Sequence, residues 1–189
     1  MEYIVLDLEW NMPEIRGQFK RSPIILHGEI IQIGAVKLNE ELEEIDSFDA
    51  IIKPEFYVKM NREIGELTSI SNEDLENGIS FKEAIKVFQD WLGLDYILIT
   101  WGTNDRLMLE ENLIVHNLDC EWIPEHYDAQ LMFDYQETME DRNFSLDYAM
   151  YYFDIKGIKA HHALNDARDT AAVIRNLNLS EFIAEEREW

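Results

Sequence analysis

The sequence predicts a single α/β domain in which helices pack against a mixed β-sheet. Segments with the apolar, β-branched composition of strands come first, and segments with helical periodicity dominate the second half. This order favours a mixed sheet covered by helices over a helical bundle or a β-sandwich. The chain has 189 residues, 47% of them hydrophobic, so we expect one compact domain spanning residues 1–189.

The first expected strand is Tyr3–Trp10, an apolar run that only Asp7 and Glu9 interrupt. Apolar runs of this length are typical of central strands that are buried on both faces. Pro13 and Gly17 follow closely, so the strand should lead into a loop.

Two further strands are expected at Glu29–Leu38 and at Glu44–Lys53, and the second should end before Pro54. With the first strand they predict three neighbouring antiparallel strands in a sheet of about five strands.

The first helix is predicted from a cap followed by helical spacing. Ser80 and Glu83 have the pattern of a capping box. The apolar residues behind them recur at helical intervals, namely Phe81, Ala84, Ile85, Phe88, Trp91 and Leu92.

The second half of the chain continues with a strand, a turn and helices. Tyr96–Trp101 has strand composition, and Asp105–Val115 behind it has helical character. A short capped helix is expected at Ser145–Tyr152. A longer helix is expected at Asn165–Leu177, where several alanines favour close packing on the sheet.

Composition limits the function. The single cysteine, Cys120, has no partner for an internal disulfide, and the first residues lack the basic and then apolar pattern of a secretion signal, so we expect a cytoplasmic protein. No apolar stretch approaches the length of a membrane span. The 39 acidic and 16 basic residues give a net charge of −23, which repels polyanions, although runs such as Asn39–Asp46 and Glu181–Glu188 should be solvated faces.

Asp7 and Glu9 are two residues apart on the first strand, so their carboxylates should lie side by side on one face. Two buried carboxylates without a basic partner favour either protonation or a bound cation. Oxygen ligands are typical of Mg²⁺ or Mn²⁺ rather than Zn²⁺. An edge strand with one solvated face explains the pair equally well.

Three more titratable residues stand near expected helices: Asp105 and Asp166 near helix starts, and His161 in the loop before the second of these helices. Asp105 and Asp166, taken singly, fit acids that cap helices, and His161 fits a surface histidine. Asp169 lies on the same helical face as Asp166, where it could support Asp166, although a surface acid is the favoured interpretation.

Taken together, these residues resemble the DEDDh branch of the RNase H-like exonucleases, the superfamily of RNase T and the proofreading exonucleases of DNA polymerases. The three motifs of that family match LDLEW with Asp7 and Glu9, WGTNDRLMLE with Asp105, and HHALNDARDTAAV with His161 and Asp166. The resemblance covers most of the chain and implies an RNase H-like fold.

Segments between the motifs are also similar to the family. GEIIQIGAVKL resembles its second strand, and LTSISNEDLENG resembles its L-T-G-I-T segment, with departures at Ser69 and Ser71. The pair Trp101–Gly102 and the segment LEWNMPE are most similar to the branch of RNA-trimming and sporulation-inhibitor-type exonucleases.

The resemblance implies a metal-dependent 3′–5′ exonuclease. By this resemblance the protein would release nucleoside 5′-monophosphates from single-stranded nucleic acid, with RNA preferred and DNA as a second substrate, and would use two divalent cations, Mg²⁺ or Mn²⁺. Asp7 would contact both ions, Glu9 and Asp166 the first, and Asp105 the second. His161 would be the general base, with the adjacent His162 as its competitor.

Substrate contacts are expected around these motifs. Trp10, Phe19 and Trp101 are candidates for stacking on bases, although each also fits the core, and Asn11 lies beside the first motif. The candidate phosphate contacts are Arg16, Lys20, Arg21, Arg106 and Lys159. So few basic side chains favour short strands or short 3′ overhangs as substrates. The resemblance also allows a homodimer.

Two other functions remain open from the sequence. A module with the exonuclease fold could act by protein contact through its acidic surface, although none of the five motif residues is missing. An acidic Ca²⁺-binding protein is a weaker alternative, because the sequence has no D-x-D-x-D-G loop.

Overall fold

The computed structural model is a mixed α/β fold built on one six-stranded sheet with strand order β4-β3-β2-β1-β5-β6. It describes residues 1–15, 17–124, 126–139, 142–157 and 161–186. The strands are β1 Glu2–Asn11, β2 Glu29–Leu38, β3 Glu44–Lys53, β4 Ile79–Ser80, β5 Tyr96–Thr100 and β6 His126–Asp128. The helices are α1 Arg62–Thr68, α2 Asn72–Asn77, α3 Phe81–Leu92, α4 Asn104–Val115, α5 Ala129–Phe133, the π-helix η1 Asp134–Thr138, α6 Leu146–Tyr152, α7 Ala163–Ile174 and α8 Leu179–Glu186.

The predicted fold class is confirmed, and so are the three antiparallel strands β1, β2 and β3. The strands β5 and β6 run parallel to β1, and β4 runs parallel to β3. The sheet has six strands rather than about five because β4 and β6, at its edges, have only two and three residues. Segments this short carry no alternation that a sequence pattern can reveal.

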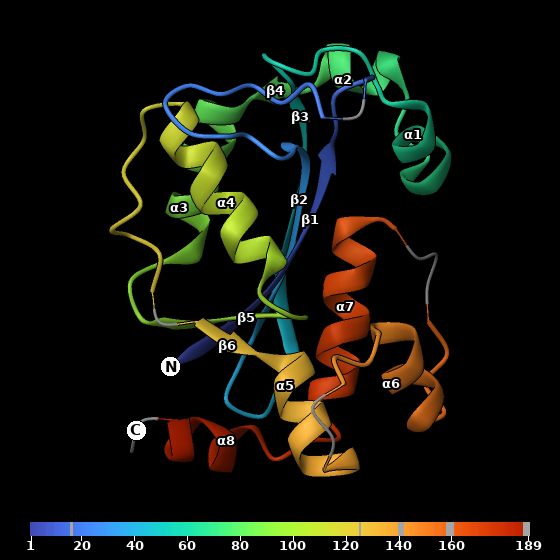
Figure 1. Cartoon of the computed structure of the whole chain (residues 1–189). Helices are drawn as coiled ribbons and strands as arrows, with labels where there is room; N and C mark the ends of the chain where they lie inside the picture. The colour runs from blue at the N-terminus through green and yellow to red at the C-terminus, as the bar shows by residue number, and fades with distance from the viewer. Residues whose placement is uncertain (16, 125, 140–141, 158–160, 187–189) are drawn as a thin grey trace.

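Two layers of helices enclose the sheet (Figure 1). The helices α3 and α4 cover one face, and α7 with α6 covers the other. Alternate residues of β1 supply the two cores: Ile4 and Leu6 pack beneath α3 and α4, whereas Tyr3 and Val5 pack beneath α7.

The predicted helices are present with shifted ends. The helix α7 begins at Ala163 rather than Asn165 and ends at Ile174. At the start of α3, Ser80 accepts a hydrogen bond from the backbone of Glu83, which is one half of the expected capping box. Among the described residues, no helix is both long enough and apolar enough to cross a membrane.

Candidate active site

The strand β1 extends past the end of its neighbour β5, and the first two carboxylates, Asp7 and Glu9, lie on this extension. The parallel pairing with β5 ends at Val5 and Ile99, so Asp7 and Glu9 lie past the last paired residue. Their partners on β2 are Gly34 for Asp7 and Gln32 for Glu9, which places both carboxylates on the face that α7 covers.

The helix α4 brings the third carboxylate to the same place from the opposite layer. Asp105 is the second residue of α4 and is only 6% exposed. Its Oδ1 accepts a hydrogen bond of 2.9 Å from the backbone N–H of Leu8, between the two carboxylates of β1. Asp105 therefore contacts β1 from the first turn of α4, whose N-cap Thr103 makes no side-chain cap hydrogen bond.

The helix α7 contributes the fourth carboxylate, and the turn before it contributes the histidine. Asp166 Oδ2 accepts a hydrogen bond of 2.9 Å from the backbone N–H of His161, which closes the turn before α7. His161 has a φ of 59°, a left-handed conformation that is uncommon for histidine. Ligand atoms of Glu9, His161 and Asp166 lie within 4.8 Å of one another, so residues from β1 and α7 can contact one ion.

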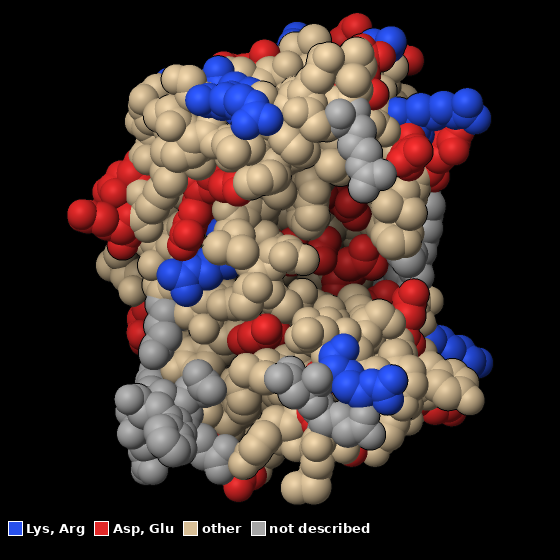
Figure 2. All heavy atoms as spheres, in the orientation of Figure 1, with Lys and Arg blue, Asp and Glu red and all other residues tan. Residues whose placement is uncertain are grey.

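The four carboxylates and His161 line one cavity of about 330 Å³. Figure 2 shows acidic side chains gathered in a hollow of the displayed face, with basic side chains in separate places around it. The lining residues are Asp7, Leu8, Glu9, Trp10, Ile64, Leu67, Trp101, Asn104, Asp105, His161 and Asp166.

Burial and mutual repulsion disfavour the charged forms of these carboxylates. Desolvation is the largest cause in each case, followed for Asp7 by the charges of Asp105, Asp166 and Glu9. The pKa of Asp7 is raised well above its ordinary value, and the pKa values of Glu9 and Asp105 are raised to about 7. Desolvation also raises the pKa of Asp166, against the opposing hydrogen bond from the backbone of His161.

This donor set fits divalent cations. Four carboxylates converge on a cavity whose described lining contains no lysine or arginine, so no side-chain cation balances them there. Oxygen donors with one nearby imidazole suit Mg²⁺ or Mn²⁺.

We expect the metal-free protein to lose stability as the pH rises. Between the ordinary pKa values near 4 and the raised values of about 7, the native state holds more protons than the unfolded state, so the free energy of unfolding falls with pH. Urea unfolding in EDTA should show a fall on the order of 3 kcal/mol between pH 4.5 and 7.5. The fall should be smaller in Asp105→Asn, and stability that rises over this range would contradict the raised pKa values.

The sequence pattern of the RNase T family, described as exonuclease, matches residues 4–174. The chain belongs to the RNase T exonuclease family. This family member is similar to the probable 3′-5′ exonuclease KapD of Bacillus subtilis, with 26% identity over 170 residues that cover 87% of this chain and 78% of KapD. It is 30% identical over 145 residues to the PolC-type DNA polymerase III of Thermotoga maritima, covering 77% of this chain and 10% of the polymerase.

Solved structures share the fold of this RNase T family member. The nuclease domain of 3′hExo, a DEDDh family member bound to rAMP, has a TM-score of 0.77 at 19% identity, covering 93% of this chain and 90% of that one. Exonuclease I of E. coli, in complex with a dT13 oligonucleotide, has a TM-score of 0.68 at 13% identity, covering 93% of this chain and 40% of that one. The predicted resemblance to DEDDh exonucleases is confirmed.

The predicted aromatic contacts differ in their positions. Trp10 and Trp101 line the cavity of the four carboxylates. Trp10 also packs on the core beside Gly28 and Met108, and Trp101 Nε1 donates a hydrogen bond of 3.2 Å to the carbonyl of Phe144. Both indoles are partly buried and present part of their surface to the cavity.

Asn11 was predicted to contact the substrate, and the structure places it elsewhere. It is fully buried, and its Nδ2 donates to the carbonyl oxygens of Tyr57 and Lys59 while its Oδ1 accepts from the backbone N–H of Asn61. All of these contacts are with the chain itself, so Asn11 holds the segment 57–61 in place rather than meeting a substrate.

Lys20, Arg21 and Arg106, the candidate phosphate contacts that the structure describes, do not line the cavity of the four carboxylates. Lys20 and Phe19 line a separate cavity of about 410 Å³, with Lys20 Nζ 4.0 Å from the ring centroid of Phe56. Arg106 pairs with Glu110 at 3.0 Å, and Arg21 is exposed. The predictions for Arg16 and Lys159 fall outside the described residues.

Asp169 was interpreted as a surface acid, but it is only 6% exposed on α7 and its carboxylate lies beside Gly157. The favoured interpretation as a surface acid is therefore wrong. The sequence patterns also missed Ile64 and Leu67 of α1, which line the cavity, because α1 itself was not predicted.

Gly34 allows α7 to approach the sheet at the residue opposite Asp7. A Cβ on Gly34 would lie 2.0 Å from the backbone nitrogen of Leu164. We expect Gly34→Ala to move the start of α7, to lower the free energy of unfolding by about 1–3 kcal/mol, and to reduce cleavage at least tenfold.

Urea unfolding and a cleavage assay would test Gly34→Ala, with Gly93→Ala as its control. Gly93 has a φ of 83° and open space around it, so a methyl group there costs backbone strain without displacing a neighbour. Gly93→Ala should lose stability and retain cleavage. Wild-type stability and cleavage in Gly34→Ala would contradict the close approach of α7.

Proposed function

We propose that this chain hydrolyses phosphodiester bonds from the 3′ end of single-stranded nucleic acid and releases nucleoside 5′-monophosphates. The convergence of Asp7, Glu9, Asp105, Asp166 and His161 on one cavity is the observation that carries the proposal. Two divalent cations, Mg²⁺ or Mn²⁺, held by the four carboxylates, would supply the positive charge that the scissile phosphate requires.

We assign the role of general base to His161, which would accept the proton of the attacking water. The ligand atom of His161 lies within 4.8 Å of those of Glu9 and Asp166, so its ring faces the carboxylates. His162 is directed elsewhere, because its Nε2 lies 3.1 Å from Gln32 Nε2 and 3.8 Å from Asp49 Oδ2. Geometry therefore favours His161 over its neighbour.

Single-stranded RNA is the proposed preferred substrate, with DNA as a second substrate. The indoles of Trp10 and Trp101 and the side chain of Leu67, which is 47% exposed, offer apolar surface for an unpaired base. Related folds occur in structures described as bound to rAMP and as recognising the 3′ end of a histone mRNA stem-loop.

The acidic surface limits the length of nucleic acid that we propose as substrate. Basic side chains are scattered around the acidic hollow in Figure 2 and form no continuous stripe on the displayed face. Bound cations would reverse the charge within the cavity, and salt screens the more distant charges over about 8 Å. Short strands or the last few nucleotides of an overhang in the cytoplasm therefore suit this chain better than long tracts.

The test is incubation with 5′-labelled single-stranded RNA and DNA of one sequence, in Mn²⁺, Mg²⁺ or EDTA, read on a denaturing gel. We expect a ladder that shortens from the 3′ end only with metal, faster on RNA, with 5′-monophosphates as products. If the folded wild type binds Mn²⁺ and cuts neither strand, the proposal fails and a module that acts by protein contact replaces it.

A further inference from the structure

Gln32 is a fully buried polar residue of β2 beside the candidate active site. It is the strand partner of Glu9, and it lies on the same face of the sheet as Asp7 and Glu9. It belongs to none of the motifs that supply the carboxylates or His161. A buried amide costs free energy unless its donors and acceptor find partners, so the partners of Gln32 identify its role.

The side-chain amide of Gln32 connects two strands to the start of α7. Its Oε1 accepts a hydrogen bond of 3.2 Å from the backbone N–H of Ala163, the first residue of α7. Its Nε2 donates to Asp49 Oδ1 at 2.8 Å and lies 3.1 Å from His162 Nε2. Because the N–H of Ala163 can only donate, the amide oxygen must face α7, which sets the orientation of the whole group.

This contact replaces a missing helix cap. The first N–H groups of a helix have no partner within the helix, and the N-cap side chain usually accepts from one of them. The N-cap of α7 is His162, which makes no side-chain cap hydrogen bond. Gln32 supplies an acceptor from the sheet instead, and Gly34 two residues later leaves room for the helix backbone.

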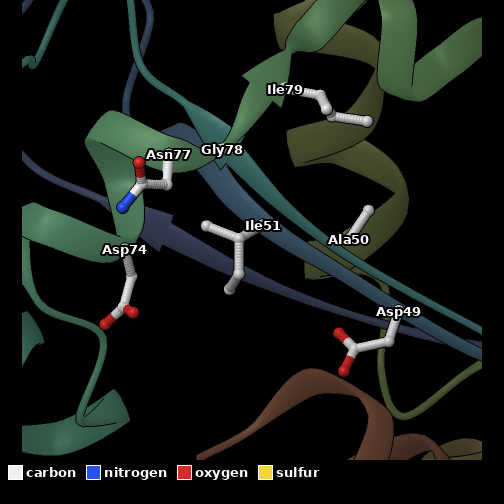
Figure 3. Close-up of a pocket in the computed structure, with 7 residues that line it drawn as sticks. All are labelled: Asp49, Ala50, Ile51, Asp74, Asn77, Gly78 and Ile79. Carbon is white, nitrogen blue, oxygen red and sulfur yellow. The ribbon is translucent and has the colours of Figure 1, made fainter.

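Asp49 holds the amide from the other side. Figure 3 shows the side chain of Asp49 on β3, well apart from those of Asp74 and Asn77 on α2. The hydrogen bond to Asp49 leaves Gln32 Oε1 aimed at α7. The chain of contacts thus runs from β3 through β2 to the helix that carries Asp166 and follows His161.

We propose that Gln32 is a positioning residue of the active site. Held by Asp49, it fixes the first turn of α7 so that His161 and Asp166 face Glu9. The expected effect of Gln32 on catalysis rests on the proposed nuclease function. Its hydrogen bond to the N–H of Ala163 does not depend on that function. Residues that orient the groups around a metal commonly change affinity or activity by about 10- to 100-fold.

Four variants separate positioning from general packing. Gln32→Leu keeps a similar volume without the hydrogen bonds, and Asp49→Ala removes the supporting acceptor from a partly exposed position. Asp49→Asn is the conservative rescue, because its Oδ1 can still accept from Gln32. Glu44→Ala is the matched control, since Glu44 also joins β3 to α7, through an ion pair of 2.8 Å with Arg168.

Three readouts apply to each folded variant: kcat and KM on the same labelled strand, Mn²⁺ affinity by electron paramagnetic resonance, and hydrogen exchange of the Ala163 amide. For Gln32→Leu we expect kcat to fall about 10- to 100-fold, weaker Mn²⁺ binding and faster amide exchange, with KM changed less than about threefold. Asp49→Ala should follow in the same direction, whereas Asp49→Asn and Glu44→Ala should resemble the wild type.

Unchanged amide exchange in Gln32→Leu would overturn the proposal, as would an equal loss of kcat in Glu44→Ala. If Gln32→Leu does not fold, the contrast between Asp49→Ala and Asp49→Asn decides, and equal behaviour of these two overturns the proposal. If the wild type cuts neither RNA nor DNA, the proposed function has failed, and the exchange and Mn²⁺ measurements still decide the role of Gln32.

Discussion

Asp7→Asn should reduce 3′-end cleavage by at least about a thousandfold and, in EDTA at pH 8, should make the protein more stable. Burial is the largest cost of charging Asp7, and the charges of Asp105, Asp166 and Glu9 add to that cost. The amide has a similar shape and no charge, so it relieves the repulsion in the metal-free protein. It also removes the ligand that lies among all the others, so Mn²⁺ should no longer stabilise the protein strongly.

Thermal unfolding with and without Mn²⁺, beside the cleavage assay, measures both halves of this expectation for Asp7→Asn. A ligand at a hundred times its Kd stabilises by about 2.7 kcal/mol, which the variant should lose. Asp90→Asn is the control, because Asp90 is exposed on α3, away from the cavity. Cleavage by Asp7→Asn at the wild-type rate would show that the carboxylates do not form the catalytic metal site.

His161→Ala should lower kcat by about 10²- to 10⁴-fold, the range that a positioned general base contributes. KM should change little, because the carboxylates that would bind the cations remain in place. Single-turnover cleavage of labelled RNA measures the loss, and Mn²⁺-dependent thermal stability reports whether the metal site survives. The backbone N–H of His161, which donates to Asp166, is retained in the variant.

His162→Ala is the matched control, since it removes the same kind of side chain one position along the chain. His162 contacts Gln32 and Asp49 instead of the carboxylate cavity, so its removal should cost less than about tenfold. A larger loss in His162→Ala than in His161→Ala would reverse the assignment of the base.

The strands and the motif residues were predictable because their signals are local. The bounds of β2 and β3 agree with the predicted Glu29–Leu38 and Glu44–Lys53, since proline and acidic turns interrupt apolar runs there. The short helices α1 and α2 were missed. Ser71 and Asp74 do form a complete capping box at α2, but the helix behind it has only six residues and little apolar periodicity.

Side chains whose role depends on distant partners were predicted less well. Asn11 has the polarity of a surface contact, yet its partners at Tyr57, Lys59 and Asn61 bury it completely. Asp169 has the composition of a surface acid but lies under the segment at Gly157. The residues that bury Asn11 and Asp169 are not their neighbours in the sequence, so no local pattern indicates that these two side chains are buried.

The sequence by itself determined that two carboxylates would stand side by side on one strand, because the two-residue period of a strand places Asp7 and Glu9 on one face. It also determined the family, because residue type and spacing carry the three motifs. Only the tertiary structure decided which histidine faces the carboxylates and what holds α7 against β2. Those outcomes depend on contacts such as Gln32 to Ala163, 131 residues apart, which form when the sheet and the helix pack.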